Sequence, residues 1–233
     1  MSTTHANEQM QEWSPSSLDG QKALVVFAHP DDSDFYVGGT IARLTAAGVN
    51  VHYLCASYGE KGDAQGFTPD QIARIRLEEQ LTAAEILGVS RENVEFLGLP
   101  DGGIVCNREL IDAIVKVIRR IKPEIVIALD INTLDPAWGV NHADHRAIGQ
   151  ATIDAVYPYA RNKNELPDLP PHEVRTLLVL NYRDPNCFVE ISGTAWQSKK
   201  AALSAHKSQW GDAEHVIEKA NQRSRESFTR IDW

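Results

Sequence analysis

Cysteine is scarce in this chain of 233 residues, which contains only three of them. They are Cys55, Cys106 and Cys187, an odd number at wide spacing. This pattern excludes a disulfide framework and the paired-cysteine spacing of a structural zinc site, and it is typical of a reducing compartment. We therefore expect stability to come from an apolar core, for which the chain is long enough.

Long apolar runs and an excess of positive charge are also missing. No stretch approaches the roughly 20 apolar residues that a membrane-spanning helix needs. Residues 1–20 contain neither a basic cluster nor an apolar one, so we expect no signal peptide, no membrane span and a cytoplasmic protein. The formal net charge is −9 and the pI is near 5.4. Because nucleic acids repel an acidic chain, we expect no nucleic-acid partner.

Apolar runs of strand length alternate with segments of helical periodicity along most of the chain. This alternation favours an α/β fold with a mostly parallel sheet and helices on both faces. We predict a single domain over residues 21–233 and a flexible N-terminal arm over residues 1–20. The predicted strands are 22–28, 50–57, the first part of 94–103, 124–130, 174–182 and 187–192, and the predicted helices are 38–48, 71–88, 109–122, 145–157, 194–210 and 214–228.

Polar side chains follow the predicted strands at the points where the strands end. His29-Pro-Asp-Asp32 follows the first strand and His142-Ala-Asp-His145 follows the fourth. Because ligands of open α/β sheets bind beyond the carboxyl ends of the strands, we expect both segments at one site. Three nitrogen or oxygen ligands with a fourth position left open are typical of catalytic zinc. A set of histidine and aspartate also suits other divalent ions.

Each of these segments also has a purely structural interpretation. Asp31 or Asp32 could cap the first predicted helix, and Asp144 could cap the predicted helix that begins at His145, since aspartate is a favoured N-cap. The presence of both clusters at one sheet edge favours a functional site. Other catalytic arrangements have less support, because no phosphate-binding glycine loop follows any strand and neither Ser33 nor Ser57 stands in a nucleophile elbow.

Together these segments resemble the LmbE/PIG-L-like family of zinc-dependent deacetylases. The A-H-P-D-D-E motif of that family reads Ala28-His29-Pro30-Asp31-Asp32-Ser33 here, with a serine in place of the glutamate and Asp34 following it. The H-x-D-H motif reads His142-Ala143-Asp144-His145. Further matches follow the family's order: Gly59-Glu60-Lys61-Gly62 for G-E-x-G, Arg76 and Glu79 for R-x-x-E, Ala84-Glu85-Ile86-Leu87-Gly88 for A-x-x-L-G, and His206-Lys207-Ser208-Gln209 for H-x-S-Q. The resemblance covers about residues 22–210.

The resemblance implies a Rossmann-like fold and the hydrolysis of an N-acyl group, usually acetyl, from an amino sugar or its conjugate. By matching position, it implies that His29, Asp32 and His145 bind one Zn²⁺ per chain and that Asp31 is the general base. Another divalent transition metal would also suit these ligands. The chemistry agrees, because bound zinc lowers the pKa of water to about 7 and a neighbouring carboxylate can accept the remaining proton.

The resemblance also gives roles to three further residues. His142 would stabilise the charge that develops on the carbonyl oxygen or assist the leaving amine. Asp144 would orient His142 or pair with its charge, and would keep it protonated near neutral pH by raising its pKa. Arg76 is implied as a substrate contact.

Three functions therefore compete, of which the first is a zinc amidohydrolase acting on a small N-acylated amino sugar or conjugate. The second is a metal-dependent hydrolase of another bond, such as a phosphoester, but only Lys61 and Arg146 are evident cations at the sheet edge. The third is a non-catalytic sugar- or metal-binding module, which would need neither Asp31 nor His142. Apolar positions near the C-terminus would permit a homo-oligomer.

Overall fold

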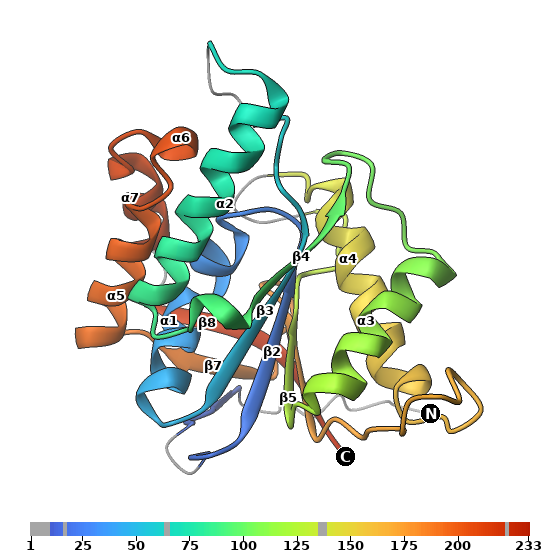
Figure 1. Ribbon diagram of the computed structural model, residues 1–233. Helices are drawn as coiled ribbons and strands as arrows, with labels where there is room; N and C mark the ends of the chain where they lie inside the picture. The colour runs from blue at the N-terminus through green and yellow to red at the C-terminus, as the bar shows by residue number, and fades with distance from the viewer. Residues whose placement is uncertain (1–9, 16–17, 63–65, 135–138, 222–223) are drawn as a thin grey trace, which may run out of the picture.

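A computed structural model describes residues 10–15, 18–62, 66–134, 139–221 and 224–233. One eight-stranded sheet lies at its centre, in the order β1-β7-β8-β6-β5-β2-β3-β4. Helices cover both faces, with α1, α2, α5 and α7 on one side and α3 and α4 on the other (Figure 1). This arrangement confirms the predicted single-domain α/β fold. The strands are β1 (Gln11–Glu12), β2 (Lys22–Phe27), β3 (Asn50–Ser57), β4 (Val94–Leu99), β5 (Ile125–Ala128), β6 (Thr176–Leu180), β7 (Cys187–Glu190) and β8 (Arg225–Asp232).

The strands that carry the site are parallel and buried. β2 pairs in parallel with β3 on one side and with β5 on the other, and β4 and β6 extend the parallel part. The run Ala23–Phe27 is at most 1% exposed, as expected of a strand covered on both faces. The carboxyl ends of β2, β3, β4 and β5 therefore meet at the same edge of the sheet. Among the strands of the described residues, only β8 runs antiparallel to its neighbours, β6 and β7.

The helices begin and end where local sequence directs them. Thr68 and Gln71 form a capping box at the start of α2, and Asn107 caps α3. Lys122 adopts a left-handed conformation at the end of α3, directly before Pro123. The helices are α1 (Asp32–Ala46), α2 (Pro69–Ile86), α3 (Arg108–Ile121), α4 (Ala143–Asp154), α5 (Gly193–Leu203), α6 (Lys207–Trp210) and α7 (Glu214–Asn221), with a 3₁₀ turn at Arg91–Asn93 and a π turn at Ala155–Tyr159.

Three predicted helices were wrong in their bounds. α1 begins at Asp32 and not near residue 38, so Asp32, one of the predicted metal ligands, lies in its first turn. The helix expected over 194–210 is broken into α5 and α6. The helix expected over 214–228 ends at Asn221, and the chain then forms β8. β8 fills the space between β6 and β7, and Phe228 at its centre is fully buried.

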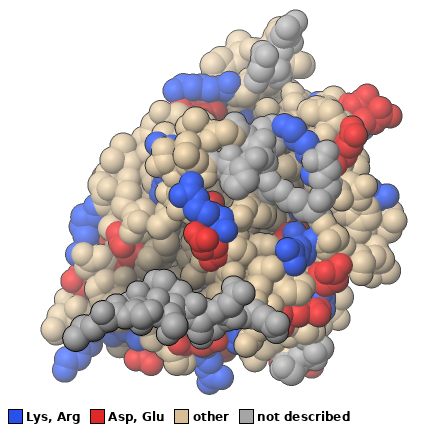
Figure 2. Space-filling view, turned by 180° about the vertical axis from the view of Figure 1, so that it is seen from behind, with Lys and Arg blue, Asp and Glu red and all other residues tan. Residues whose placement is uncertain are grey.

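Part of the predicted N-terminal arm is packed onto the domain. Gln11 and Glu12 form β1, which pairs with β7, and Trp13 is only 8% exposed. Residues 1–9 and 16–17 of the predicted arm lie outside the described residues. Within the described part of the chain, the helices are too short or too polar to cross a bilayer. On the face seen in Figure 2, acidic and basic side chains are interspersed among uncharged ones.

Candidate metal centre and active site

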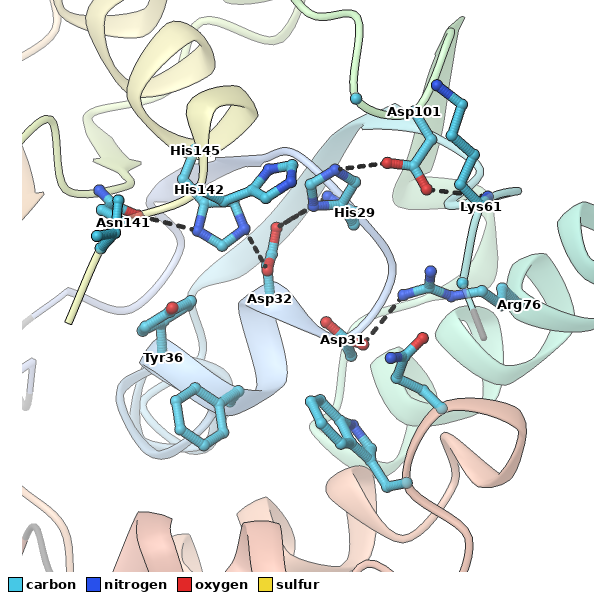
Figure 3. A pocket seen from close by; sticks show the side chains of 16 residues that line it. His29, Asp31, Asp32, Tyr36, Lys61, Arg76, Asp101, Asn141, His142 and His145 are labelled. Atoms are coloured by element: carbon cyan, nitrogen blue, oxygen red, sulfur yellow. Dashed lines mark hydrogen bonds and ion pairs between the residues drawn. The ribbon is translucent and has the colours of Figure 1, made fainter. Parts of the chain in front are cut away.

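A pocket of about 470 Å³ opens where the carboxyl ends of the parallel strands meet. Its walls come from the β2–α1 turn, the β3–α2 and β4–α3 loops, the start of α4, and α6. Figure 3 shows the imidazoles on one side of this pocket and Arg76 and Lys61 on the other. Both histidine–aspartate segments predicted from the sequence therefore reach one site. The lining residues are His29, Asp31, Asp32, Phe35, Tyr36, Lys61, Gly62, Arg76, Asp101, Gly102, Val140, Asn141, His142, His145, Gln209 and Trp210.

The β2–α1 turn places three polar residues at the pocket. His29 follows β2, and its backbone N–H donates to Oδ2 of Asp32 at 2.8 Å, which closes the turn. Asp31, between them, has φ of 95° and ψ of −29°. A residue other than glycine in this left-handed region costs about 1–3 kcal/mol and persists only where its surroundings impose it. The surroundings of Asp31 therefore impose the conformation of this turn, and the turn sets the directions of the side chains of His29, Asp31 and Asp32.

The three predicted metal ligands lie together. Oδ1 of Asp32 is 3.0 Å from Nε2 of His145, and Oδ2 of Asp32 is 3.5 Å from Nδ1 of His29 (Figure 3). A tetrahedral ion at about 2.1 Å from each ligand separates neighbouring ligand atoms by about 3.4 Å. Two imidazoles and a carboxylate are a donor set that suits catalytic zinc, and the two separations are close to this value.

The far side of the His29 ring is held by two carboxylates. Nε2 of His29 is 3.1 Å from Oδ2 of Asp144 and 3.2 Å from Oδ1 of Asp101. Burial lowers the pKa of His29, but hydrogen bonds to Asp101, Asp144 and Asp32 outweigh it and raise the pKa to about 12. When Nε2 carries a proton for these carboxylates, Nδ1 of the neutral ring is left as a metal ligand, an arrangement common in zinc enzymes.

His145 is oriented in the same manner by an amide. Nδ1 of His145 is 3.2 Å from Oδ1 of Asn141. The Nδ2 atom of Asn141 donates to the carbonyl oxygens of Asp130 and Asn132, so its Oδ1 is the atom that faces the histidine. A hydrogen bond from Nδ1–H of His145 to this oxygen leaves Nε2 free to bind a metal beside Asp32.

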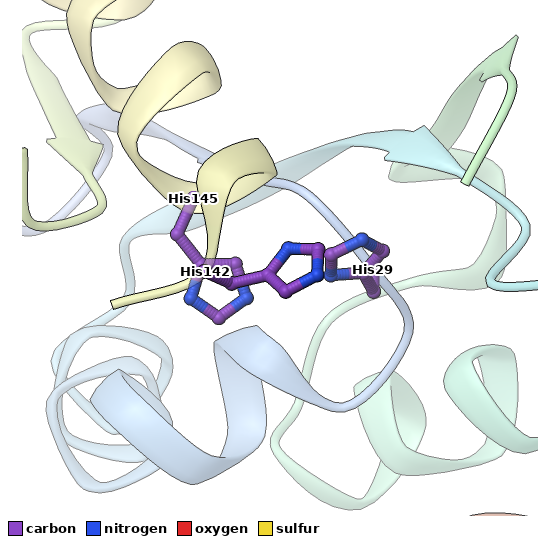
Figure 4. A group of neighbouring side chains, drawn as sticks. All are labelled: His29, His142 and His145. Carbon is purple, nitrogen blue, oxygen red and sulfur yellow. The ribbon is translucent and has the colours of Figure 1, made fainter. Parts of the chain in front are cut away.

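His142 completes a cluster of three imidazoles. Each of His29, His142 and His145 offers a ring nitrogen, and these atoms lie within 4.8 Å of one another (Figure 4). His142 is the exposed N-cap of α4, and its Nδ1 accepts the backbone N–H of Asp144 at 3.3 Å. Nε2 therefore carries the proton of the neutral ring. Burial lowers the pKa of His142, and repulsion by His29 and His145 lowers it further, despite the nearby carboxylate of Asp144.

The role expected for Asp144 needs a correction. Its carboxylate was expected to pair with His142, but it accepts the backbone N–H groups of Gly102 at 2.7 Å and Ile104 at 3.2 Å and lies against His29. Burial raises the pKa of Asp144, but these hydrogen bonds outweigh it, so the net pKa is lowered. Asp144 thus orients His29, and its backbone rather than its carboxylate orients His142.

Asp31 and Arg76 form a buried ion pair at the edge of the pocket. Nη2 of Arg76 lies 3.0 Å from Oδ2 of Asp31 and also donates to the carbonyl of Pro30 at 2.6 Å, while Nη1 donates to that of Gly59. Burial raises the pKa of Asp31 to about 6, against the opposing effect of Arg76. Arg76, implied above as a substrate contact, lines the pocket but is 5% exposed and directs these donors to the protein.

Two residues of the site received no role from the sequence. Asp101 follows β4, and its position at a strand end was the only signal available for it. Asn141 precedes the H-x-D-H motif and stands four residues before His145, which brings the two to the same side of the start of α4. Both act on a metal-ligand candidate through its outer nitrogen.

Known proteins are similar to this chain in sequence and in fold. Residues 24–156 match the family described as GlcNAc-PI de-N-acetylase (PIG-L). The diacetylchitobiose deacetylase of Thermococcus kodakarensis is 35% identical over 197 residues, which are 82% of this chain and 71% of that protein. The structure of N,N'-diacetylchitobiose deacetylase from Pyrococcus horikoshii in complex with its inhibitor superposes with a TM-score of 0.81 at 25% identity, covering 93% of this chain and 86% of that one.

A hydratase shares the fold as well. The 4-carboxy-2-hydroxymuconate hydratase of Pseudomonas putida KT2440 superposes with a TM-score of 0.76 at 24% identity, covering 91% of this chain and 96% of that one. At this identity the likeness concerns the fold alone, so the fold does not decide the reaction. The match over more than half of the sequence does decide the family: this chain belongs to the PIG-L family of de-N-acetylases, also known as LmbE-like proteins.

Proposed function

We propose that this protein is a zinc-dependent amidohydrolase that removes the N-acetyl group from an amino sugar or an N-acetylglucosamine conjugate. Its family and its named deacetylase relatives support N-deacetylation. The observation that carries the proposal is the position of Asp32 between His29 and His145, with the outer nitrogen of each ring turned to a separate acceptor. All three residues line one pocket, which supports their assignment as the metal ligands.

His29, Asp32 and His145 would hold the metal, with His142 at the open side of the cluster. When bound, zinc would supply a water molecule of lowered pKa and would polarise the carbonyl oxygen of the amide. The pocket admits a sugar-sized ligand, because its volume is about 470 Å³. Phe35, Tyr36 and Trp210 give it apolar surface beside the polar groups.

Asp31 would act as the general base. Its carboxylate lines the pocket directly beside Asp32, and burial brings its pKa to about 6. A base with a pKa near the working pH accepts a proton from water and can then deliver that proton to the leaving nitrogen. Arg76 holds Oδ2 of Asp31, which orients the carboxylate for this transfer.

His142 would donate a hydrogen bond to the carbonyl oxygen as negative charge develops on it. Its lowered pKa favours the neutral ring, and its Nδ1 is taken by the backbone N–H of Asp144. The remaining Nε2–H is a fixed donor, and a donor placed before the reaction stabilises the oxyanion without reorganisation. This differs from the protonated His142 expected from the sequence.

The test is amine release from a panel of N-acetylated amino sugars, with N,N'-diacetylchitobiose and N-acetylglucosamine included. We expect the zinc-loaded wild type to deacetylate at least one of them. Asp31→Asn should retain zinc and lose roughly a factor of 10²–10⁴ in kcat, the range for a lost general base. Wild-type turnover by Asp31→Asn would remove Asp31 from its role, and release of phosphate from phosphoesters without amine release would favour the alternative hydrolase.

A further inference from the structure

The backbone of Asp31 is held in its left-handed conformation from two directions. On the side-chain side, Arg76 donates to Oδ2 of Asp31 and to the carbonyl of Pro30. On the backbone side, the N–H of Asp31 donates to Oε1 of Gln80 at 2.8 Å. Arg76 and Gln80 stand four residues apart and therefore lie on one face of α2. A single helix thus fixes both the carboxylate and the peptide that carries it.

The side chain of Gln80 has no freedom to turn. It is 0% exposed, and its Nε2 donates to Oδ2 of Asp34 at 3.0 Å and to Oγ of Ser33 at 3.3 Å. Oδ2 of Asp34 also lies 2.7 Å from Nε2 of His206, in a pair that is at most 1% exposed. A carboxylate only accepts and a backbone N–H only donates, so the amide must present its oxygen to Asp31 and its nitrogen to Asp34.

This network lies at the position where the sequence departs from the family motif. Ser33 replaces the glutamate of A-H-P-D-D-E, and Asp34 follows it. Both side chains are fully buried beneath the β2–α1 turn, and Gln80 contacts both. No motif contains Gln80. A glutamine meets both needs here because it carries an acceptor and a donor on one planar group without charge.

We propose that Gln80 is a positioning residue, which fixes the left-handed backbone of Asp31 and so directs the general base at the reacting amide. This inference rests on the proposed function. Gln80 is not among the residues that line the pocket, and its hydrogen bonds go to Asp31, Ser33 and Asp34, so Asp31 is its direct link to the proposed catalytic groups. Arg76 alone cannot replace it, because Arg76 leaves the N–H of Asp31 without an acceptor.

A double-mutant cycle tests this. Gln80→Met keeps the length of the side chain and removes its hydrogen bonds to Asp31, Ser33 and Asp34. In the wild-type background we expect kcat to fall about 10- to 100-fold with KM within about twofold, since a small misplacement of a reacting group has effects of this size. In the Asp31→Asn background, where the base is already lost, Gln80→Met should change the residual kcat less than about twofold. Zinc content should be that of the wild type in both backgrounds.

Two further variants distinguish a loss of positioning from a general loss of stability. Gln80→Glu keeps an acceptor for the N–H of Asp31 but places a second buried carboxylate against Asp34, so we expect it to recover only part of the kcat lost in Gln80→Met. Ile118→Ala removes buried volume from α3, on the other side of the sheet. It shows how much kcat changes when only the Tm is lowered. An equal fold loss of kcat in both backgrounds, or a Gln80→Met enzyme with wild-type kcat, would overturn the proposal.

Amide hydrogen exchange gives a readout that does not depend on catalysis. Exchange over residues 30–35 should be faster in Gln80→Met than in the wild type, and as slow as in the wild type in Ile118→Ala. Unchanged exchange over 30–35 in Gln80→Met would contradict the positioning role even if the wild type deacetylated no substrate on the panel. An inactive wild type with faster exchange in the variant would instead reject the proposed function and leave the structural link intact.

Discussion

Nε2 of His29 lies 3.2 Å from Oδ1 of Asp101, on the side of the ring opposite to Asp32. The other oxygen of Asp101 accepts the backbone N–H of Lys61 at 3.0 Å, so the carboxylate also connects the β3–α2 loop to the candidate metal centre (Figure 3). The outer partner of a ligand histidine fixes its tautomer and raises its basicity. We therefore expect Asp101 to affect metal binding without being one of the proposed ligands.

We predict that Asp101→Asn weakens zinc binding. The asparagine amide can still contact His29 but carries no charge to stabilise the ring, and losses of about 10- to 100-fold in affinity are typical of such changes. The zinc Kd, measured by competition with a chromophoric chelator, should rise by that factor. Asp112→Asn, which removes a carboxylate from the surface pair with Arg108, is the control and should bind zinc as the wild type does. An unchanged Kd in Asp101→Asn would reject this role.

Zinc binding should release protons near neutral pH. The pKa of His29 is raised to about 12 in the metal-free protein, so this ring is protonated at neutral pH and must lose its proton to become a ligand. Because the proton competes with the metal, affinity should increase by about tenfold for each unit of rising pH around neutrality. Calorimetry in two buffers of different ionisation enthalpy measures the proton count directly. A binding enthalpy that is the same in both buffers would contradict the prediction.

Arg119 should be among the residues on which stability depends most. It is 2% exposed, and its guanidinium donates to six backbone carbonyls that shape the chain after α4. Arg119→Met leaves these carbonyls without donors, and we expect the free energy of unfolding to fall by about 3–5 kcal/mol. The adjacent Arg120→Met removes only an exposed pair with Glu95 and should cost less than about 1 kcal/mol. Urea unfolding of both variants measures these changes, and an equal loss of the free energy of unfolding in the two variants would contradict the prediction.

The local parts of the fold could be predicted from the sequence. Apolar runs identified the buried strands, and the two histidine–aspartate segments followed from their positions at strand ends. β8 could not be identified in this way, because the polar pattern of Arg225–Asp232 suits a helix as well as a strand. Its conformation is set by pairing with β6 and β7, which are distant in sequence. Tertiary pairing of this kind overrides local propensity.

In the site as well, local sequence identified residues but not their contacts in the fold. Residues within the motifs were found, but their partners were assigned by proximity in the chain, which paired Asp144 with its neighbour His142. The Asp144 carboxylate instead reaches His29, because it is turned toward the backbone N–H groups of Gly102 and Ile104. Gln80 gave no signal at all, since only the packing of α2 against the β2–α1 turn gives it a function.

We predict that N-deacetylation requires one zinc ion, held in part by His145. The most direct measurement is zinc content together with amine release from N,N'-diacetylchitobiose, before and after chelation and re-addition of zinc. We expect about one zinc per wild-type chain, with activity lost on chelation and restored by zinc. His145→Ala should bind no zinc and should have no activity with or without added zinc. His215→Ala, on the exposed face of α7, should behave as the wild type. Full deacetylation by a zinc-free wild type, or by His145→Ala, would contradict the account.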